Sequence, residues 1–213
     1  MNLSFLLADD HVIVRRGLRN LLYDRFHASD VAEVATCRDL LDTLAHKEPA
    51  LLVLDLQLTD GSSMDYLQQI CREHPAMRVL VYTMRSEEVY AQRVLALGAA
   101  GFLSKESSEE DVVVAVRHVL QGRPYMSETV EDHLQDKAKD EGSKANPFQL
   151  LSDREILVVD NLLAGMGVKE ISTRLALGPT TVATYKARLF DKLGVTNILD
   201  LQRLATAHRH HMA

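Results

Sequence analysis

Short apolar runs alternate five times with helical segments along the first 122 residues of the chain. The central run, Leu51–Leu54, is apolar at every position. A strand of this kind is expected where helices cover both faces of a sheet, which is the usual arrangement of parallel sheets. The pattern therefore predicts a doubly wound α/β domain with a five-stranded parallel sheet. The predicted strands are Leu3–Ala8, Val31–Ala35, Ala50–Leu54, Arg78–Tyr82 and Ala100–Leu103.

The character of the sequence changes after residue 122. Residues 123–147 are mostly polar and contain a charged stretch, which is typical of an exposed linker. Residues 129–138 within this segment are also compatible with a short helix. From residue 148 onward the pattern is entirely helical. We therefore predict a first domain at residues 1–122, a linker at 123–147 and a small all-α domain at 148–213.

Helix boundaries in both predicted domains follow from capping residues. In a capping box, a serine and a glutamate three residues later each bind the backbone N–H group of the other. This pattern predicts helices that begin at Ser107 with Glu110 and at Ser152 with Glu155. Gly194 follows a long helical pattern and is expected to end that helix, because glycine readily adopts the left-handed conformation found there.

Composition excludes several classes of protein. No apolar run approaches the roughly 18 residues needed to span a bilayer. The first residues lack the basic segment of a signal peptide, so we expect a cytoplasmic protein that does not contact a membrane. Cys37 and Cys71 form no Cys-x-x-Cys pair, which argues against a zinc or redox motif. The histidines near the C-terminus are expected to be a solvated end; they are His208, His210 and His211.

Acidic and other polar residues follow four of the predicted strands. Asp9, Asp10 and Asp55 come at two strand ends, and Thr83 and Lys105 come at two others. Ligands of open α/β sheets bind at the carboxyl ends of the strands, so these side chains should lie together. Three neighbouring carboxylates repel one another, and Mg²⁺ relieves that repulsion through the oxygen ligands it prefers. A carboxylate beside Mg²⁺ can attack a phosphoryl group, while the metal and a lysine neutralise the charge.

Two other interpretations of the acidic pair are open. Asp9 and Asp10 would also suit the cap of a helix that begins near His11. A set of metal ligands formed by Asp9, Asp10 and His11 is less favoured, because His11 is expected to begin the helix and to point elsewhere.

These five residues, in this order and at strand ends, resemble the receiver domain of two-component systems. Phe102 also falls where receivers keep a switch aromatic residue. The resemblance implies a flavodoxin-like fold in which Asp55 accepts a phosphoryl group in a phosphorelay. It implies that Asp10, Asp55 and the backbone carbonyl of Gln57 hold Mg²⁺, with Asp9 acting through water. A sensor histidine kinase is the implied partner.

The resemblance also implies that Thr83 and Phe102 move once Lys105 pairs with the phosphoryl group. One departure is that Leu58 and Thr59 stand where receivers usually carry Met-Pro. Leu58 can fill the space of the methionine, whereas the loss of proline puts the stiffness of this loop in doubt.

Gln57 and Arg85 each lie two residues after a residue of the acidic site. We expect both to flank the phosphoryl group and to set the lifetime of the phosphorylated state by controlling access of water. The alternative is that both are ordinary surface side chains.

Residues 151–195 are similar, without a gap, to the LuxR/NarL-type helix-turn-helix, and they end in the specific string Lys192-Leu193-Gly194-Val195. Helical geometry places Val182, Leu189 and Leu193 on one face. The opposite face would enter the major groove of DNA. The candidate DNA-binding residues are Lys169, Thr180, Thr181, Ala183, Thr184, Lys186, Ala187, Arg188 and Lys192.

Base contacts are expected from five of these residues, and phosphate contacts from the three lysines. The candidate base readers are Thr180, Ala183, Thr184, Ala187 and Arg188. Residues 148–213 carry eight Lys or Arg against six Asp or Glu, and Ala183 stands where many relatives have a polar residue. This charge is small for a DNA-binding domain. We therefore expect modest affinity as a monomer and reliance on a homodimer.

The sequence as a whole predicts a bacterial response regulator and transcription factor, controlled by phosphorylation of Asp55, that binds promoter double-stranded DNA. We expect no separate enzymatic substrate, although the receiver would catalyse its own phosphorylation and dephosphorylation. One rival is a Mg²⁺-dependent phosphatase or phosphotransferase, which a second acid at position 57 would favour. The other is a phosphorylation-independent DNA-binding regulator whose receiver serves as a protein-interaction module; the intact acidic set argues against it.

Overall fold

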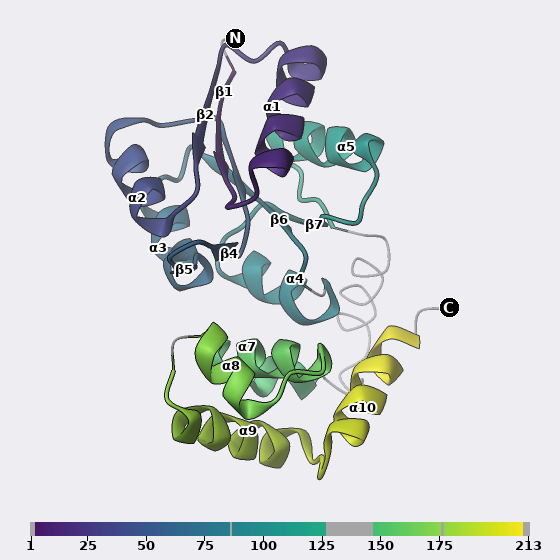
Figure 1. Cartoon of the computed structure of the whole chain (residues 1–213). Helices are drawn as coiled ribbons and strands as arrows, with labels where there is room; N and C mark the ends of the chain where they lie inside the picture. Colours follow the sequence, from purple (N-terminus) through teal and green to yellow (C-terminus); the bar gives the residue numbers. More distant parts are fainter. Residues whose placement is uncertain (1–2, 86, 127–146, 176, 211–213) are drawn as a thin grey trace. The chain divides into compact units, whose positions relative to one another are not determined.

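The computed structural model describes residues 3–85, 87–126, 147–175 and 177–210. The chain divides into two compact units, Met1–Asp132 and His133–Ala213 (Figure 1). The segment 129–138, whose sequence is compatible with a short helix, lies outside the described residues.

The first unit is built on a five-stranded parallel sheet with the strand order β2-β1-β3-β6-β7. This confirms the predicted fold class. The strands are β1 (Ser4–Ala8), β2 (Asp30–Val34), β3 (Leu51–Leu54), β6 (Arg78–Thr83) and β7 (Gly101–Ser104). All four residues of β3 are buried, as expected for the central strand of a sheet covered on both faces. A short antiparallel hairpin, β4 (Gln57–Leu58) with β5 (Gly61–Ser62), was not predicted.

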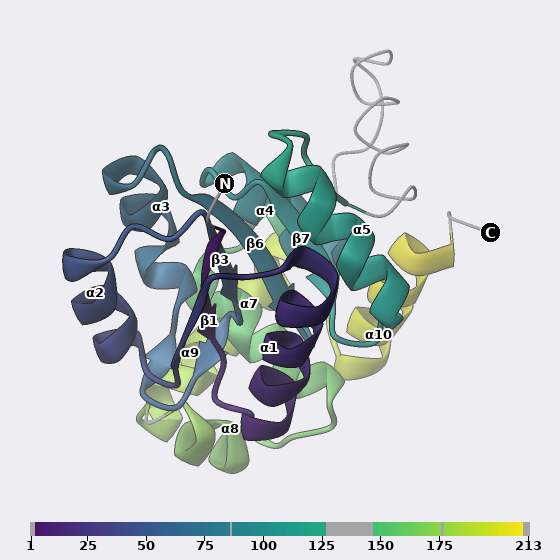
Figure 2. The ribbon, with the colours of Figure 1, turned by 90° about the horizontal axis from the view of Figure 1, so that it is seen from above.

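Helices cover both faces of this sheet. They are α1 (Val12–Phe26), α2 (Cys37–His46), α3 (Met64–Glu73), α4 (Glu87–Ala96) and α5 (Glu109–Leu120). Figure 2 shows α1 and α5 on one face and α2 and α3 on the other. Under α1 and α5, leucines and valines of both helices pack against apolar side chains of β1, β3, β6 and β7 to form one core.

The cap of α5 lies one residue later than the sequence pattern predicted. Ser108 and Asp111, and not Ser107 and Glu110, form the capping box. The predicted pair was wrong because the turn after β7 takes up Ser107, whose N–H donates to the carbonyl of Ser104.

The backbone around Tyr125 extends the sheet at its β7 edge. Tyr125 N–H donates to the Ala100 carbonyl at 3.1 Å, and the Tyr125 carbonyl accepts from Phe102 N–H at 2.9 Å. The Tyr125 ring also packs edge-on against His118, with ring centroids 5.8 Å apart. Although Tyr125 lies in the segment predicted as an exposed linker, it is half-buried and bound to the sheet.

The second unit is helical in its described residues, as predicted. It contains a 3₁₀ turn at Pro147–Leu150, α7 (Asp153–Leu163), α8 (Val168–Arg174), α9 (Pro179–Leu193) and α10 (Ile198–His210). The predicted capping box of Ser152 and Glu155 opens α7. Gly194 ends α9 with φ 65°. The predicted inner face of α9 is buried, through Val182, Leu189 and Leu193.

None of the helices in the described ranges is long and apolar enough to cross a membrane.

The approach of Tyr125 to β7 requires a residue without a side chain at position 101. A Cβ atom at Gly101 would lie 2.8 Å from the Tyr125 carbonyl oxygen and 3.0 Å from Leu80 Cδ1. We expect Gly101→Ala to lower the free energy of unfolding by about 1–3 kcal/mol, the usual cost of overpacking. Urea unfolding followed by circular dichroism measures this change.

Gly17→Ala is the matched control, because a Cβ at this exposed position of α1 meets nothing within 4 Å. Removing glycine from a helix interior should raise the free energy of unfolding by about 0.5–1 kcal/mol. Equal effects of the two substitutions would contradict the close approach at Gly101.

Candidate functional site

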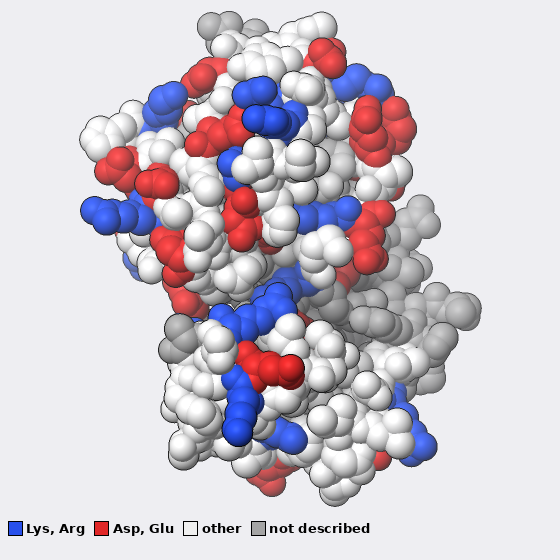
Figure 3. Space-filling view, in the orientation of Figure 1, with Lys and Arg blue, Asp and Glu red and all other residues white. Residues whose placement is uncertain are grey.

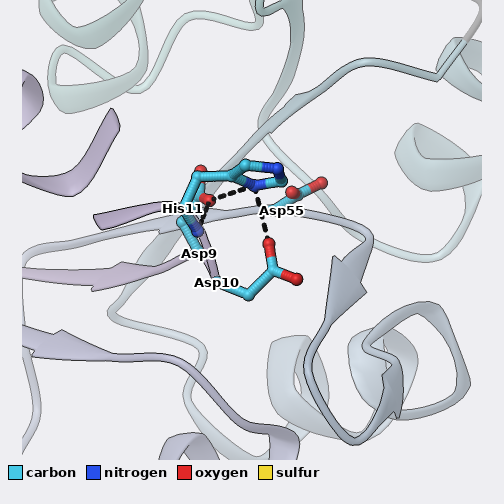
Figure 4. Close-up of side chains that lie close together, drawn as sticks. All are labelled: Asp9, Asp10, His11 and Asp55. Atoms are coloured by element: carbon cyan, nitrogen blue, oxygen red, sulfur yellow. Dashed lines mark hydrogen bonds and ion pairs between the residues drawn. The ribbon is translucent and has the colours of Figure 1, made fainter. Parts of the chain in front are cut away.

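The carboxyl ends of β1, β3, β6 and β7 bring the five predicted site residues together. Asp9 and Asp10 follow β1, and Asp55 follows β3. Asp9 and Asp55 are buried, with 3% and 4% of their surface exposed. Figure 4 shows the side chains of the three aspartates gathered with that of His11.

Lys105, just after β7, lies between two of these carboxylates. Its Nζ is 2.7 Å from Asp9 Oδ2 and 2.6 Å from Asp55 Oδ2. Burial of the ammonium group lowers the pKa of Lys105, but its hydrogen bonds to Asp55 and Asp9 outweigh that effect, so the pKa lies above its ordinary value. The lysine is therefore the charged partner of both buried carboxylates.

Asp55 is also fixed through its second oxygen. The Thr83 hydroxyl donates to Asp55 Oδ1 at 2.7 Å, and Gln57 N–H donates to the same atom at 3.3 Å. Arg85 Nη2 donates to Gln57 Oε1 at 3.2 Å. The two residues expected to flank the phosphoryl group thus contact each other beside Asp55 and Thr83.

The hairpin after Asp55 is held by residues that sequence reasoning missed. The Asp60 carboxylate accepts from the backbone N–H groups of Cys37 and Arg38, at 2.6 and 3.1 Å. Burial raises the pKa of Asp60, but these bonds outweigh it and lower the pKa below its ordinary value. Ser63 Oγ donates to the Asp55 carbonyl at 2.6 Å. These contacts anchor the loop, which lacks the usual proline. The turn dipeptide Asp60-Gly61 is the sequence signal that could have predicted the hairpin.

The expectation that His11 points elsewhere was wrong. His11 Nδ1 is 2.7 Å from Asp10 Oδ1 and 3.2 Å from Asp9 Oδ1. His11 occupies the N-cap position of α1 with extended backbone angles, φ −87° and ψ 105°, so its ring lies against the acidic residues. Of the alternative in which the two aspartates cap α1, the structure shows one contact: Asp9 Oδ1 accepts a hydrogen bond from the N–H group of His11, the N-cap residue, at 2.8 Å.

The residues at this edge fit a divalent cation. Asp9, Asp10, His11 and Asp55 each offer one ligand atom, and these four atoms all lie within 4.8 Å of one another. Asp10 Oδ1 is buried and accepts no hydrogen bond from the described residues. An oxygen left in this state is costly, and coordination to a cation would satisfy it.

Phe102, the predicted switch residue, lies in the middle of β7 and is fully buried. It does not contact Asp55 through any hydrogen bond, but its backbone N–H is the donor that binds Tyr125. It therefore joins the strand that leads to Lys105 with the chain segment that leaves the first unit.

In the second unit, α9 carries most of the predicted DNA-binding residues on an exposed face. The exposed members are Thr180, Thr181, Ala183, Thr184, Ala187 and Arg188. Lys186 is half-buried, with Nζ 5.3 Å from the centroid of the Phe190 ring. Lys169 is exposed near the start of α8. Figure 3 shows that much of the visible surface of this unit carries no charged side chain.

Lys192 contacts another side chain of its own unit. Its Nζ donates to Glu155 Oε2 at 2.7 Å, and Glu155 is only 3% exposed. Burial raises the pKa of Glu155, but Lys192 and Ser152 outweigh it and lower the pKa below its ordinary value. Lys192 thus ties the end of α9 to the start of α7, and its predicted phosphate contact stays a prediction.

Comparison with protein families matches both units. Residues 5–117 match the family described as the response regulator receiver domain. Residues 149–205 match the bacterial regulatory proteins of the luxR family. Among curated relatives, the response regulator GacA of Pseudomonas aeruginosa is 30% identical over 206 residues, which cover 97% of this chain and 96% of GacA. The response regulator UvrY of Escherichia coli K12 is 29% identical and covers 97% of this chain and 94% of UvrY.

Solved structures similar to the whole chain include RcsB. RcsB of Salmonella enterica serovar Typhimurium, bound to promoter P1flhDC in the presence of phosphomimetic BeF₃⁻, has a TM-score of 0.69 at 25% identity. The match covers 97% of this chain and 100% of that one. A structure of two RcsB dimers bound to two parallel DNAs has a TM-score of 0.60 at 25% identity and covers 97% and 98%.

The ion pair of Lys192 and Glu155 predicts a stability effect. Lys192→Met should lower the free energy of unfolding by about 1–2 kcal/mol, because it leaves the buried carboxylate without its cation; partial exposure of the lysine limits the loss. The Glu155 pKa is lowered in the folded state, so this stabilisation is present above the unfolded pKa and is lost as pH falls through the folded pKa.

Denaturant titration at neutral and acidic pH measures this effect. Lys169→Met, at an exposed position, is the control and should change stability by less than about 0.5 kcal/mol. The ion pair would have no structural role if both variants were equally stable at neutral pH.

Proposed function

The chain belongs to the response regulators that join a receiver domain to a LuxR-type DNA-binding domain, and we propose that phosphorylation of Asp55 controls its binding to DNA. The observation that carries this proposal is the surrounding of Asp55, a buried carboxylate with Lys105 on one oxygen and Thr83 on the other. Glu155 is also a buried carboxylate with a cation and a hydroxyl, but both of these partners lie on one oxygen, Oε2, whereas those of Asp55 lie on different oxygens.

In the proposed reaction an Asp55 oxygen attacks the phosphorus of a phosphohistidine on a sensor kinase, or of a small phosphodonor. The bond from phosphorus to the donor breaks, and an acyl phosphate forms on Asp55. Asp10, Asp55 and the Gln57 carbonyl would hold Mg²⁺, with Asp9 acting through water, and the ion when bound supplies charge neutralisation at the phosphoryl oxygens. Water later attacks the acyl phosphate and releases inorganic phosphate.

The side chains around Asp55 supply the remaining charge and hydrogen bonds. The Lys105 ammonium already contacts Asp55 and would pair with a phosphoryl oxygen. The Thr83 hydroxyl would turn from the carboxylate to the phosphoryl group, and Phe102 would move with it. This change would shift the receiver between two states.

The Asp55 assignment is tested by mass spectrometry of the chain after incubation with Mg²⁺ and acetyl phosphate. We expect wild type to gain the mass of one phosphoryl group and Asp55→Asn to gain none. Hydroxylamine, which cleaves acyl phosphates, should reverse the gain. Unmodified wild type, or a phosphorylated Asp55→Asn variant, would contradict the assignment.

Gln57 and Arg85 are proposed to set how long the phosphoryl group stays on Asp55. Their mutual hydrogen bond lies beside the carboxylate, where an attacking water would approach. We expect Arg85→Ala and Gln57→Ala each to change the dephosphorylation rate severalfold, measured by loss of the phosphorylated mass over time. Arg72→Ala, at an exposed position of α3, is the control. Unchanged rates in both variants would refute the proposal.

For DNA binding, we propose that α9 enters the major groove of promoter DNA and that the active form is a dimer. The exposed face of α9 supports the first point. The small positive charge of this domain supports the second, because two recognition helices would share the binding energy. Promoter DNA lies in the bacterial cytoplasm, where we propose that the protein acts together with its sensor kinase.

Two substitutions separate base contacts from phosphate contacts. Arg188→Ala should cost about 1–3 kcal/mol of binding free energy on the preferred sequence and relax specificity at one base pair. Lys169→Ala should weaken binding to all sequences alike and reduce the salt slope by about 1. Fluorescence anisotropy on a selected promoter fragment and on scrambled DNA measures both effects. The assigned role of Arg188 fails if its loss weakens both DNAs equally.

A further inference from the structure

His11 is the one nitrogen donor among the four clustered ligand atoms of the acidic site. We propose that His11 Nδ1 is a metal ligand, so that this site also takes a divalent transition metal ion and binds it more tightly than carboxylates alone would. The inference rests on the metal site of the proposed function and adds to it a residue and a class of ion.

The distances between donor atoms fit coordination to one ion. His11 Nδ1 lies 2.7 Å from Asp10 Oδ1 and 3.2 Å from Asp9 Oδ1. Nitrogen and oxygen ligands stand about 2.1 Å from such metals, so neighbouring ligands of an octahedral ion are about 3.0 Å apart. The two observed separations lie on either side of that value.

The bonds of Lys105 leave Oδ1 of Asp9 and Asp10 to His11, whose Nδ1 is at hydrogen-bond distance from Asp9 Oδ1 and would exchange that contact for a cation. Lys105 takes Oδ2 of both Asp9 and Asp55. On the other side, Asp10 Oδ1 is buried and accepts no hydrogen bond from the described residues. His11 Nδ1 lies 2.7 Å from that oxygen, so one cation bound to both atoms would satisfy the oxygen and use the nitrogen lone pair.

The chain holds His11 in this position. Its backbone N–H donates to Asp9 Oδ1 at 2.8 Å, and α1 begins at the next residue. The ring needs no large movement to act as a ligand. Because an imidazole nitrogen suits ions such as Co²⁺, Ni²⁺ and Zn²⁺, whereas Mg²⁺ prefers oxygen, His11 should matter for the first group and little for the second.

The rival role for His11 is that of a positively charged counter-ion of Asp9 and Asp10. A counter-ion opposes every cation, so its removal would strengthen binding of Mg²⁺ and Co²⁺ alike. A ligand supports only the ion that accepts nitrogen. The ratio of the two affinities therefore distinguishes the two roles.

The test uses the full chain in which His208, His210 and His211 are replaced by serine, so that the C-terminal histidines do not bind the probe. Calorimetry gives the affinity for Co²⁺ and for Mg²⁺, with and without His11→Asn. We expect the substitution to lower Co²⁺ affinity at least about tenfold and to change Mg²⁺ affinity by less than about threefold. His46→Asn, at an exposed position of α2, is the matched control and should change neither.

Proton NMR of the Co²⁺-loaded chain gives a direct signature. An imidazole bound through Nδ1 has an exchangeable Nε2–H proton whose signal the paramagnetic ion shifts far from the normal range. We expect one such signal, present in the His46→Asn chain and absent in His11→Asn. An unchanged Co²⁺ affinity, a parallel change in both affinities, or persistence of this signal in His11→Asn would overturn the proposal.

Failure of this proposal and failure of the proposed function are distinguishable. The phosphodonor experiment uses wild type and Mg²⁺, and it reports on Asp55 whether or not His11 binds a metal. The Co²⁺ experiment needs no phosphorylation. Loss of the phosphorylation result would overturn the Asp55 assignment and leave the test of His11 intact.

Discussion

A buried ammonium group between two buried carboxylates is the interaction on which this receiver depends. Lys105 joins Asp9 and Asp55, and through them it joins the carboxyl ends of β7, β1 and β3. Removing one partner of such a group leaves an uncompensated charge in a low-dielectric site, which is strongly unfavourable. The three strands must therefore end at the same level of the sheet. The proposed phosphorylation of Asp55 would act on this arrangement, because a phosphoryl group there would change what Lys105 pairs with.

The first unit contains a continuous set of contacts from this site toward the chain that leaves it. Lys105 follows β7, Phe102 is buried in the middle of that strand, and the Phe102 N–H group holds the Tyr125 carbonyl. Gly101 allows that approach because it has no side chain. A shift of β7 would therefore also displace Tyr125, which lies at the start of the segment that connects the receiver to the DNA-binding domain.

The sequence predicts the sheet, its strand ends and the meeting of Asp9, Asp55 and Lys105, because apolar runs define strands and parallel strands share one edge. It does not predict features that depend on local backbone geometry or on distant partners. Ser107 and Ser108 are equally good caps, and only the turn after β7 decides between them. The orientation of the His11 ring depends on the extended backbone just before α1. Helical geometry alone suggests that Lys192 is an exposed phosphate contact. Its ion pair with Glu155, 37 residues earlier, can be seen only in the folded structure.

The central claim is that phosphorylation of Asp55 and binding of DNA by α9 are coupled within one chain. The most direct measurement is the affinity of the full chain for a promoter fragment, with and without the phosphoryl mimic beryllofluoride in the presence of Mg²⁺, at several protein concentrations. The account predicts that the mimic tightens binding at least about fivefold, the low end of allosteric coupling, in step with dimer formation, and that Asp55→Asn abolishes the response. Identical affinities with and without the mimic, or a response that survives in Asp55→Asn, would contradict it.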